Sequence, residues 1–258
     1  LSATNLQYDV YRFDDYVAND GTKYNKGQYI PSLSQGDDPN ASFSNAKIEK
    51  QGDRTWLVTL TLAKNVKYDI VFWAYADKAP YNFDEPNAKI NVTDNYTGLA
   101  NAENRDAFYG ICREYSVISS ETKVELRRPF AQINFGASDF AQIDELGLDM
   151  ESTVVISGLA DTYNILEGTI SGDATTALEL NTVPAQFDPA ETLVVNGKEY
   201  GYVSMNYVLA PQEAKELANV SATFAYNGQE VQLDVPNVPF QRNYRTNIIG
   251  TFFTDEVT

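Results

Sequence analysis

The sequence contains no histidine and only one cysteine, Cys112. Without histidine there is no Ser-His-Asp triad, no Cys-His pair, no histidine general base and no route to most zinc or copper sites. A lone cysteine cannot form an internal disulfide, and because no histidine can activate it we interpret Cys112 as a buried structural thiol. These absences remove the commonest nucleophilic and metal-dependent mechanisms.

Long apolar runs and phosphate-binding glycine motifs are missing as well. No stretch of about 20 apolar residues could span a membrane as a helix, and neither the dinucleotide-binding nor the P-loop glycine pattern occurs. No signal peptide is visible at the start, which is Leu1. We therefore expect the chain to be a processed or truncated form of a longer precursor.

Positive charge is scarce. The chain has 19 basic and 36 acidic residues, which gives a formal net charge of −17. An acidic surface repels nucleic acid and anionic membranes, so neither is expected as the main partner. The simplest role for this charge is to keep the protein in solution.

What the sequence does contain is a period-two pattern over most of its 258 residues. Residues 55–63, TWLVTLTLA, place their apolar side chains from Trp56 to Leu62 on one face, as in a half-buried strand. Residues 68–76, YDIVFWAYA, are apolar on both faces, as in a central strand. Many short strands between turn signals predict an all-β sandwich architecture. Short helices are expected in three places: residues 101–110, 138–146 (with Ser138 as the candidate N-cap) and 210–218.

One hairpin is predicted in detail. Asn227-Gly228 fits a two-residue type I′ turn, because both positions of that turn need a positive φ. The turn and the apolar pattern choose the same register, and we expect Phe224 and Val231 to be opposite one another and both buried. Asn196-Gly197 is a second candidate for a turn of this type, although the flanking pattern indicates its register less clearly. The apolar cross-strand pairs of the main hairpin are Phe224 with Val231, Ala222 with Leu233, and Val220 with Val235.

A phase shift divides the segment ETKVELRRPFAQINFG, residues 121–136. Its apolar residues lie on even numbers up to Leu126 and on odd numbers from Ala131 onward, so the buried face changes. We interpret the segment as a connection between two sandwiches, residues 1–126 and 127–258. An ordinary β-bulge within one domain is the alternative. The junction residues are Arg127, Arg128 and Pro129; the arginines would meet acidic surfaces of both domains, and the proline suits a bulge or a strand start.

Candidate sites for chemistry are few. Adjacent carboxylates occur at Asp14-Asp15, Asp37-Asp38 and Asp144-Glu145, but in a chain with 36 acidic residues such pairs arise by chance. The fragments GDDPN and ANDG resemble parts of calcium loops without completing one, so turns are expected there. We therefore predict no enzyme activity, no cofactor and no metal site.

Two aromatic and acidic segments, residues 7–16 (QYDVYRFDDY) and 79–86 (APYNFDEP), could bind a glycan. Most aromatic residues of a β-sandwich, however, belong to its core. Both interpretations stay open from the sequence.

Four segments, taken together, resemble the fimbrillin-like surface proteins of Bacteroidales: YDIVFWAYA, NRDAFYG, VELRRPFAQINFGASD and NYRTNIIGTFFT. The resemblance touches both halves of the chain, and RPFAQINFG and NYRTNIIG are its most specific parts. It implies two tandem transthyretin-like (Greek-key) β-sandwich domains with a few short helices. It also implies a lipoprotein precursor, exported with a signal peptide to the outer membrane, from which a protease removes an N-terminal strand.

In this family a strand of the next fimbrial subunit then fills the vacated groove by strand addition. Leu6, Tyr8 and Val10, in the first visible strand, would border that groove. The chain departs from stalk-type members by ending soon after Phe253. The donor strand could lie within NIIGTFFT, could be missing, or could be unnecessary in a subunit that only accepts.

These observations predict a non-enzymatic structural and adhesive subunit of a bacterial surface fimbria, whose partners are other subunits and a receptor or glycan. The alternative is a glycan-binding surface lipoprotein on the same fold. Stalk, tip and anchor positions are all compatible with the sequence.

Overall fold

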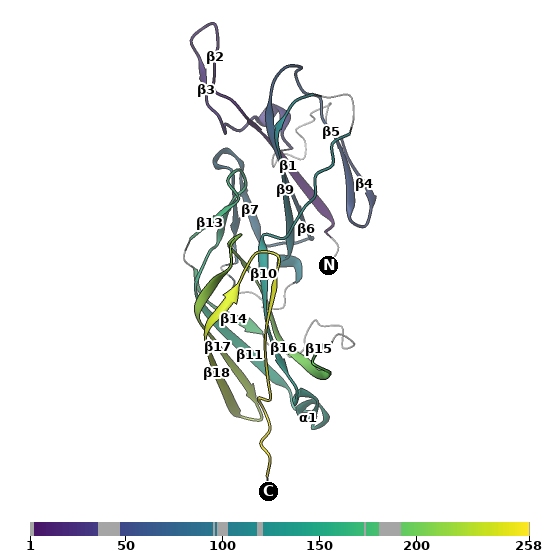
Figure 1. The fold of residues 1–258 in the computed structure, drawn as a ribbon, viewed down its shortest axis with the longest axis vertical. Coiled ribbons are helices and arrows are strands. Elements are labelled where there is room, and N and C mark those ends of the chain that lie inside the picture. Colours follow the sequence, from purple (N-terminus) through teal and green to yellow (C-terminus); the bar gives the residue numbers. More distant parts are fainter. Residues whose placement is uncertain are drawn as a thin grey trace. The chain divides into compact units, whose positions relative to one another are not determined.

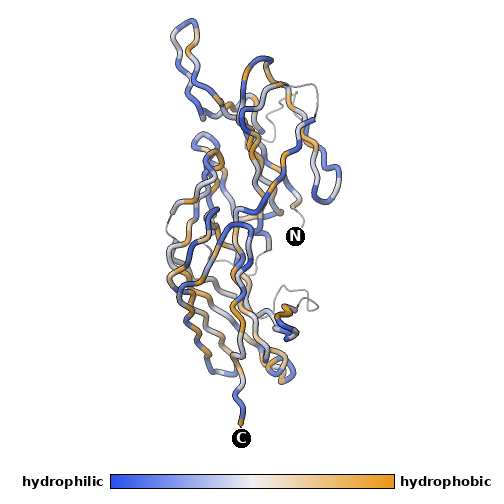
Figure 2. The backbone as a smooth tube through the Cα atoms, viewed as in Figure 1, coloured by the Kyte–Doolittle hydropathy of each residue, from blue (hydrophilic) through white to orange (hydrophobic). Residues whose placement is uncertain are grey.

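The computed structural model describes residues 3–35, 47–94, 96, 103–117, 121–172, 174–180 (backbone only) and 192–257. Short strands in several sheets make up most of these residues, which confirms the all-β prediction (Figure 1). Hydrophobic and hydrophilic residues alternate along many of the paired strands, as Figure 2 shows.

Contacts between residues group the chain into two compact units. The predicted domains, residues 1–126 and 127–258, stay a prediction, and the units differ from them by exchanging two segments, residues 92–103 and 162–169. The first unit consists of Leu1–Asn91, Asn104–Arg128 and Thr162–Thr169, and the second of Val92–Glu103, Pro129–Asp161 and Ile170–Thr258.

The first unit is built on a three-stranded antiparallel sheet in the order β1-β6-β9. The strand β6, which was expected to be central, lies between the other two and is largely buried on both faces. The strands are β1 (Asn5–Arg12), β6 (Tyr68–Tyr75) and β9 (Ala107–Tyr115).

Smaller elements surround this sheet. The strand predicted to reach Leu62 ends at Thr59, although Leu60 and Leu62 still pack on the same apolar cluster. The paired strands are β2 (Tyr16–Val17) with β3 (Lys23–Tyr24), β4 (Lys47–Gly52) with β5 (Thr55–Thr59), and β13 (Thr169–Ser171), β12 (Thr162–Asn164), β8 (Lys89–Val92) and β7 (Tyr81–Asp84) in that order. The 3-10 helices are Pro31–Leu33, Glu85–Asn87 and Glu103–Arg105.

The second unit contains two four-stranded sheets. The rings of Phe135 and Phe224, one from each sheet, meet in its core with centroids 6.0 Å apart. The first sheet has the order β15 (Leu193–Val195), β16 (Lys198–Leu209), β10 (Phe130–Ala137), β19 (Arg245–Gly250). The second has the order β14 (Ala174–Leu180), β11 (Met150–Leu159), β17 (Lys215–Tyr226), β18 (Gln229–Phe240).

The hairpin register is confirmed, with one correction. Asn227 and Gly228 have φ of 50° and 70°, and all three expected apolar pairs form between β17 and β18. Phe224 is buried, but Val231 is only half-buried, because β18 is the edge strand of its sheet among the residues that the structure describes. The Asn196-Gly197 hairpin also forms, between β15 and β16.

All three helix expectations need correction. In the segment 101–110 the described residues form the 3-10 helix Glu103–Arg105, and the strand β9 begins at Ala107. The segment 210–218 is not helical: β17 begins at Lys215, and its alternating pattern joins a long hairpin that outweighs a short helical signal. The helix α1 (Phe140–Glu145) exists, but its N-cap is Asp139, not Ser138.

The phase shift falls where the chain passes from one unit to the other. Leu126 packs on an apolar cluster of the first unit, whereas Ile133 and Phe135 are buried in the second. The grouping of contacts ends the first unit's segment at Arg128 and starts the second unit's segment at Pro129, directly before β10.

Candidate functional site

The predicted groove residues share one face of the sheet β1-β6-β9. Leu6, Tyr8 and Val10 are alternate residues of β1, so their side chains point to the same side. They are 8%, 3% and 0% exposed and pack with Ile70 and Ala74 of β6. The three residues therefore lie together at the base of one apolar face.

The layer above this face is small in the part of the chain that the structure describes. Three strands form the base, the described opposing layer is the two-stranded pair β4–β5, and among these residues β5 pairs with no strand except β4. The hydrophobic side chains of the face are accordingly half-buried and keep apolar surface accessible: Ile30, Leu33, Ile48, Trp56, Val58, Leu60, Leu62, Phe72, Phe108, Cys112, Tyr115 and Leu126. We name this set the half-buried face.

The outer edge of β1 is occupied by a connection. The Tyr8 N–H donates to Gln35 Oε1 (3.2 Å) and the Val10 N–H to Ser34 Oγ (2.8 Å), so side-chain oxygens stand where a neighbouring strand would offer carbonyls. The Arg12 N–H donates to the carbonyl of Gln28 at 2.9 Å. The role of Leu6, Tyr8 and Val10 as a groove border stays a prediction, and the connection covers this edge from Tyr8 to Arg12.

On the other edge of the sheet, an extended segment crosses β9. The main chains of Tyr109 and Arg127 exchange two hydrogen bonds of 2.8 Å. A Cβ on Gly110 would lie 2.5 Å from Leu126 Cδ2 and 3.0 Å from the carbonyl of Glu125. Only glycine lets the segment lie so close to the strand.

The two junction arginines behave differently. Arg128 Nε donates to both carboxylate oxygens of Asp106, at 2.9 and 2.8 Å, and its guanidinium lies 4.7 Å from the centroid of the Phe108 ring. Burial raises the pKa of Asp106, and Arg128 partly offsets that rise. The side chain of Arg127 makes an exposed ion pair with Glu125. Both acceptors belong to the first unit.

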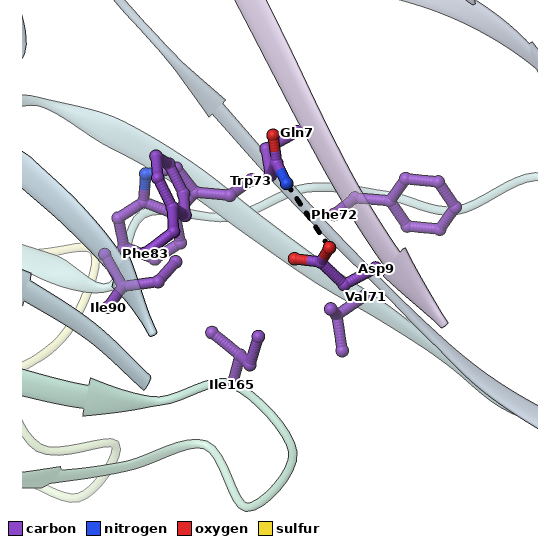
Figure 3. A pocket seen from close by; sticks show the side chains of 8 residues that line it. All are labelled: Gln7, Asp9, Val71, Phe72, Trp73, Phe83, Ile90 and Ile165. Atoms are coloured by element: carbon purple, nitrogen blue, oxygen red, sulfur yellow. Dashed lines mark hydrogen bonds between the residues drawn. The ribbon is translucent and has the colours of Figure 1, made fainter. Parts of the chain in front are cut away.

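A small cavity lies on the opposite face of the β1-β6-β9 sheet (Figure 3). The side chain of Gln7 donates to Asp9 Oδ1 (3.3 Å) beside it, and Trp73 and Ile165 help to line it. At about 10 Å³ the cavity has room for one water molecule at most. It cannot hold a small-molecule substrate.

The two aromatic segments separate in the structure. In residues 79–86 both rings are half-buried, and Tyr81 contacts Trp73 (5.5 Å between centroids) while Phe83 contacts Tyr75 (5.5 Å). Glycan binding by that segment stays a prediction. In residues 7–16 the last residue, Tyr16, is 53% exposed.

Tyr16 belongs to the hairpin β2–β3, which stands away from the β1-β6-β9 sheet (Figures 1 and 2). Tyr16 and Tyr24 are cross-strand partners and their rings stack at 6.1 Å with an angle of 30°. The guanidinium of Arg12 lies 4.2 Å from the centroid of the Tyr24 ring. The hairpin ends in the ANDG segment, which forms a turn as expected: the Ala18 N–H donates to the carbonyl of Thr22 at 2.8 Å.

The carboxylate pairs show no catalytic arrangement among the residues described. Asp14-Asp15 lies at the base of the hairpin, Asp144-Glu145 lies at the end of α1, and residues 37–38 fall outside the described part, as does GDDPN. No group of three potential metal ligands occurs among the described side chains. Cys112 is free and half-buried. The pKa of its thiol is raised mainly by burial and, to a smaller extent, by the negative charge of the nearby Asp69.

The segment NIIGTFFT is used within its own unit. The strand β19 pairs in parallel with β10, and Phe252 and Phe253 pack on the Phe224 ring. Asp139, 3% exposed, accepts hydrogen bonds from the main-chain N–H groups of Phe252 (3.1 Å), Phe253 (2.6 Å) and Thr254 (2.8 Å) and from the Thr254 hydroxyl (3.1 Å). We name this set the Asp139 clamp; nothing in the sequence indicates it, because its partners lie over 110 residues away.

No helix among the described residues is long and apolar enough to cross a bilayer.

Comparisons with known proteins give one family and several distant structures. The profile of a family of unknown function, DUF6562, matches residues 3–258. No curated protein matches the chain in sequence.

The similar solved structures include proteins of Bacteroides species. A candidate cell adhesion protein of Bacteroides uniformis has 11% identity and a TM-score of 0.48, with 97% of this chain and 89% of that chain covered. A candidate cell adhesion protein of Bacteroides ovatus has 12% identity and a TM-score of 0.48, with 95% of this chain and 93% of that chain covered. A candidate polysaccharide-binding protein of Bacteroides thetaiotaomicron has 11% identity and a TM-score of 0.44, with 95% of this chain and 82% of that chain covered. No residue role is carried over from them.

Proposed function

The chain belongs to DUF6562, a family of unknown function, and we propose that it is a non-enzymatic structural and adhesive subunit of a bacterial surface fimbria, joined to its neighbours by strand addition. The proposal includes a lipoprotein precursor at the outer membrane. Its main support is the half-buried face of the first unit.

Two features of the face suit a donor strand. A strand laid along β5 would add the missing member of the upper layer, because β5 pairs only with β4 in the described part of the chain. It would also cover Leu60 and Leu62, which lie beyond the end of β5 and are only half-buried. Main-chain hydrogen bonds would supply affinity, and the alternating side chains would supply specificity.

The expected stabilisation is substantial. Burying a large apolar side chain completely contributes about 1.5–3 kcal/mol, so completing the burial of four half-buried residues gives roughly 3–6 kcal/mol. About eight added ladder bonds at about 1 kcal/mol each would add to this. An exposed strand edge is otherwise an aggregation hazard.

The native thiol offers a test, since Cys112 lies on the half-buried face. The chain is treated with a trypsin-like protease, and SDS gels are examined for ladders while the alkylation rate of Cys112 is measured. Strand addition predicts ladders in which Cys112 is protected from alkylation. Leu60→Asp should abolish both effects, whereas Leu146→Asp, at a leucine 69% exposed in the second unit, should not.

Two results would overturn the proposal: no ladder forms under any processing condition, or a ladder forms in which Cys112 alkylates at the monomer rate and Leu60→Asp has no effect.

A second candidate function, a glycan-binding surface lipoprotein, is favoured by the exposed Tyr16 ring on the hairpin β2–β3. A glycan-array signal from a monomer that never forms ladders would support this candidate over the fimbrial one.

A further inference from the structure

We propose that the hairpin β2–β3 is a carbohydrate-binding site in which the ring of Tyr16 stacks on a neutral pyranose. This rests on the adhesive part of the proposed function and names its contact surface. Three observations carry it: the exposure of Tyr16, the stack beneath it and the two exposed aspartates that precede it in the chain.

The exposed residues contribute little to the fold of the hairpin. Tyr16 and Val17 are adjacent large hydrophobic residues that are 53% and 61% exposed. Such a hairpin buries little surface of its own and is at best marginally stable in isolation. Apolar side chains kept in water and rimmed by polar residues mark an interaction site.

The Tyr16 ring is held in place before any ligand arrives. It stacks on Tyr24, its cross-strand partner, and Tyr24 in turn carries the guanidinium of Arg12 at 4.2 Å. Asp15 Oδ1 accepts from the Lys26 N–H at 2.7 Å, which fixes the base of the hairpin. A rigid tyrosine with few rotatable bonds gives a large contact area at low entropic cost.

The side chains around the ring favour a neutral sugar. Carbohydrates stack the C–H face of a pyranose on an aromatic ring and donate their hydroxyls to carboxylates. Asp14 and Asp15 directly precede Tyr16 and are exposed, and Asp15 uses only one oxygen in the hydrogen bond that fixes the hairpin base. Two of the nearby cations lie over rings, Arg12 over Tyr24 and Lys26 over Phe13 at 5.0 Å, while Lys23 of β3, opposite Val17, is exposed. A net charge of −17 further disfavours an anionic ligand.

The test uses the full chain and an array of neutral oligosaccharides from β-glucan, xylan, galactan and mannan, with acidic glycans and a basic peptide as comparison probes. The best-binding neutral oligosaccharide is then titrated calorimetrically. Tyr16→Ala should weaken its binding about tenfold or more, as loss of an aromatic anchor does. Tyr16→Phe should keep the affinity, because it keeps the ring.

The matched control is Tyr244→Ala, which removes an equally exposed tyrosine (62%) from the second unit and should leave binding unchanged. Absence of any neutral-glycan signal, equal binding by Tyr16→Ala, or binding only to the acidic glycans or the basic peptide would overturn the inference. The two proposals are separated by testing Tyr16→Ala for ladder formation, which should be unaffected. Loss of glycan binding with normal ladders would therefore concern the glycan site alone, and loss of ladders with normal glycan binding would concern strand addition alone.

Discussion

Replacing Asp139 by alanine should release the C-terminal segment from the second unit. The carboxylate is almost fully buried, and its Oδ2 alone accepts from the N–H groups of Phe253 and Thr254 and from the Thr254 hydroxyl. Phe252 stacks on Phe224 with centroids 6.4 Å apart, and Phe253 meets the same ring edge to face at 5.4 Å. One side chain thus holds the segment that closes this end of the core.

The magnitude follows from these contacts. Each hydrogen bond to a charged group contributes about 1.5–3 kcal/mol, and each aromatic pair about 0.5–1.5 kcal/mol. The full sum is not lost, because a terminal segment that detaches regains hydrogen bonds to water. We expect Asp139→Ala to lower the free energy of unfolding by about 3 kcal/mol. Asp139→Asn should cost less than Asp139→Ala, because the amide oxygen can replace Oδ2 and keep three of the four hydrogen bonds, while the NH2 group would face only the N–H of Phe252.

Two measurements check this, with Asp255→Ala as the control for removing an exposed acid of the same tail. Urea denaturation should show the loss for Asp139→Ala only. Hydrogen exchange at the amides of Phe252, Phe253 and Thr254 should accelerate by up to about 100-fold, the factor that 3 kcal/mol represents. Unchanged exchange at these amides, or a loss below about 1 kcal/mol, would refute the clamp.

Three further predictions concern packing and charge. Phe224→Ala should cost about 3–5 kcal/mol in urea denaturation, and Val231→Ala less than about 1.5 kcal/mol because its side chain is half-buried; equal losses would contradict the edge position of β18. Gly110→Ala should cost about 1–3 kcal/mol, because its Cβ would overlap the segment crossing β9, and a neutral effect would contradict that contact. Because the folded-state pKa of Asp106 is raised, this group favours folding more as pH falls from above that pKa toward its ordinary value; Arg128→Met should raise the pKa further in an NMR titration, and a lowered pKa would contradict the pairing.

Much of the secondary structure follows from local pattern. The Asn227-Gly228 turn fixed the register of β17 and β18 because a two-residue loop with positive φ allows one pairing, and the alternating apolar residues agreed with it. The helix expected at residues 210–218 failed for a related reason: a short helical signal is weak against a 12-residue hairpin strand that begins at Lys215.

The candidate site was less accessible to sequence reasoning. Leu6, Tyr8 and Val10 could be placed on one face of a strand, because alternation decides that. Their neighbours could not be identified. The connection that donates to and accepts from β1 comes from residues 27–35, and its Ser34 and Gln35 side chains look like ordinary loop residues in the sequence.

The sequence by itself determined the all-β class, the hairpin registers and the absence of histidine chemistry, since each depends on residue type or on neighbours a few positions apart. Only the tertiary structure decided that Tyr81 is half-buried against Trp73 while Tyr16 is exposed, and that Asp139 holds a segment 113 residues away. Segments with similar aromatic and acidic residues differ in burial, because contacts between residues distant along the chain determine which side chains stay accessible to water.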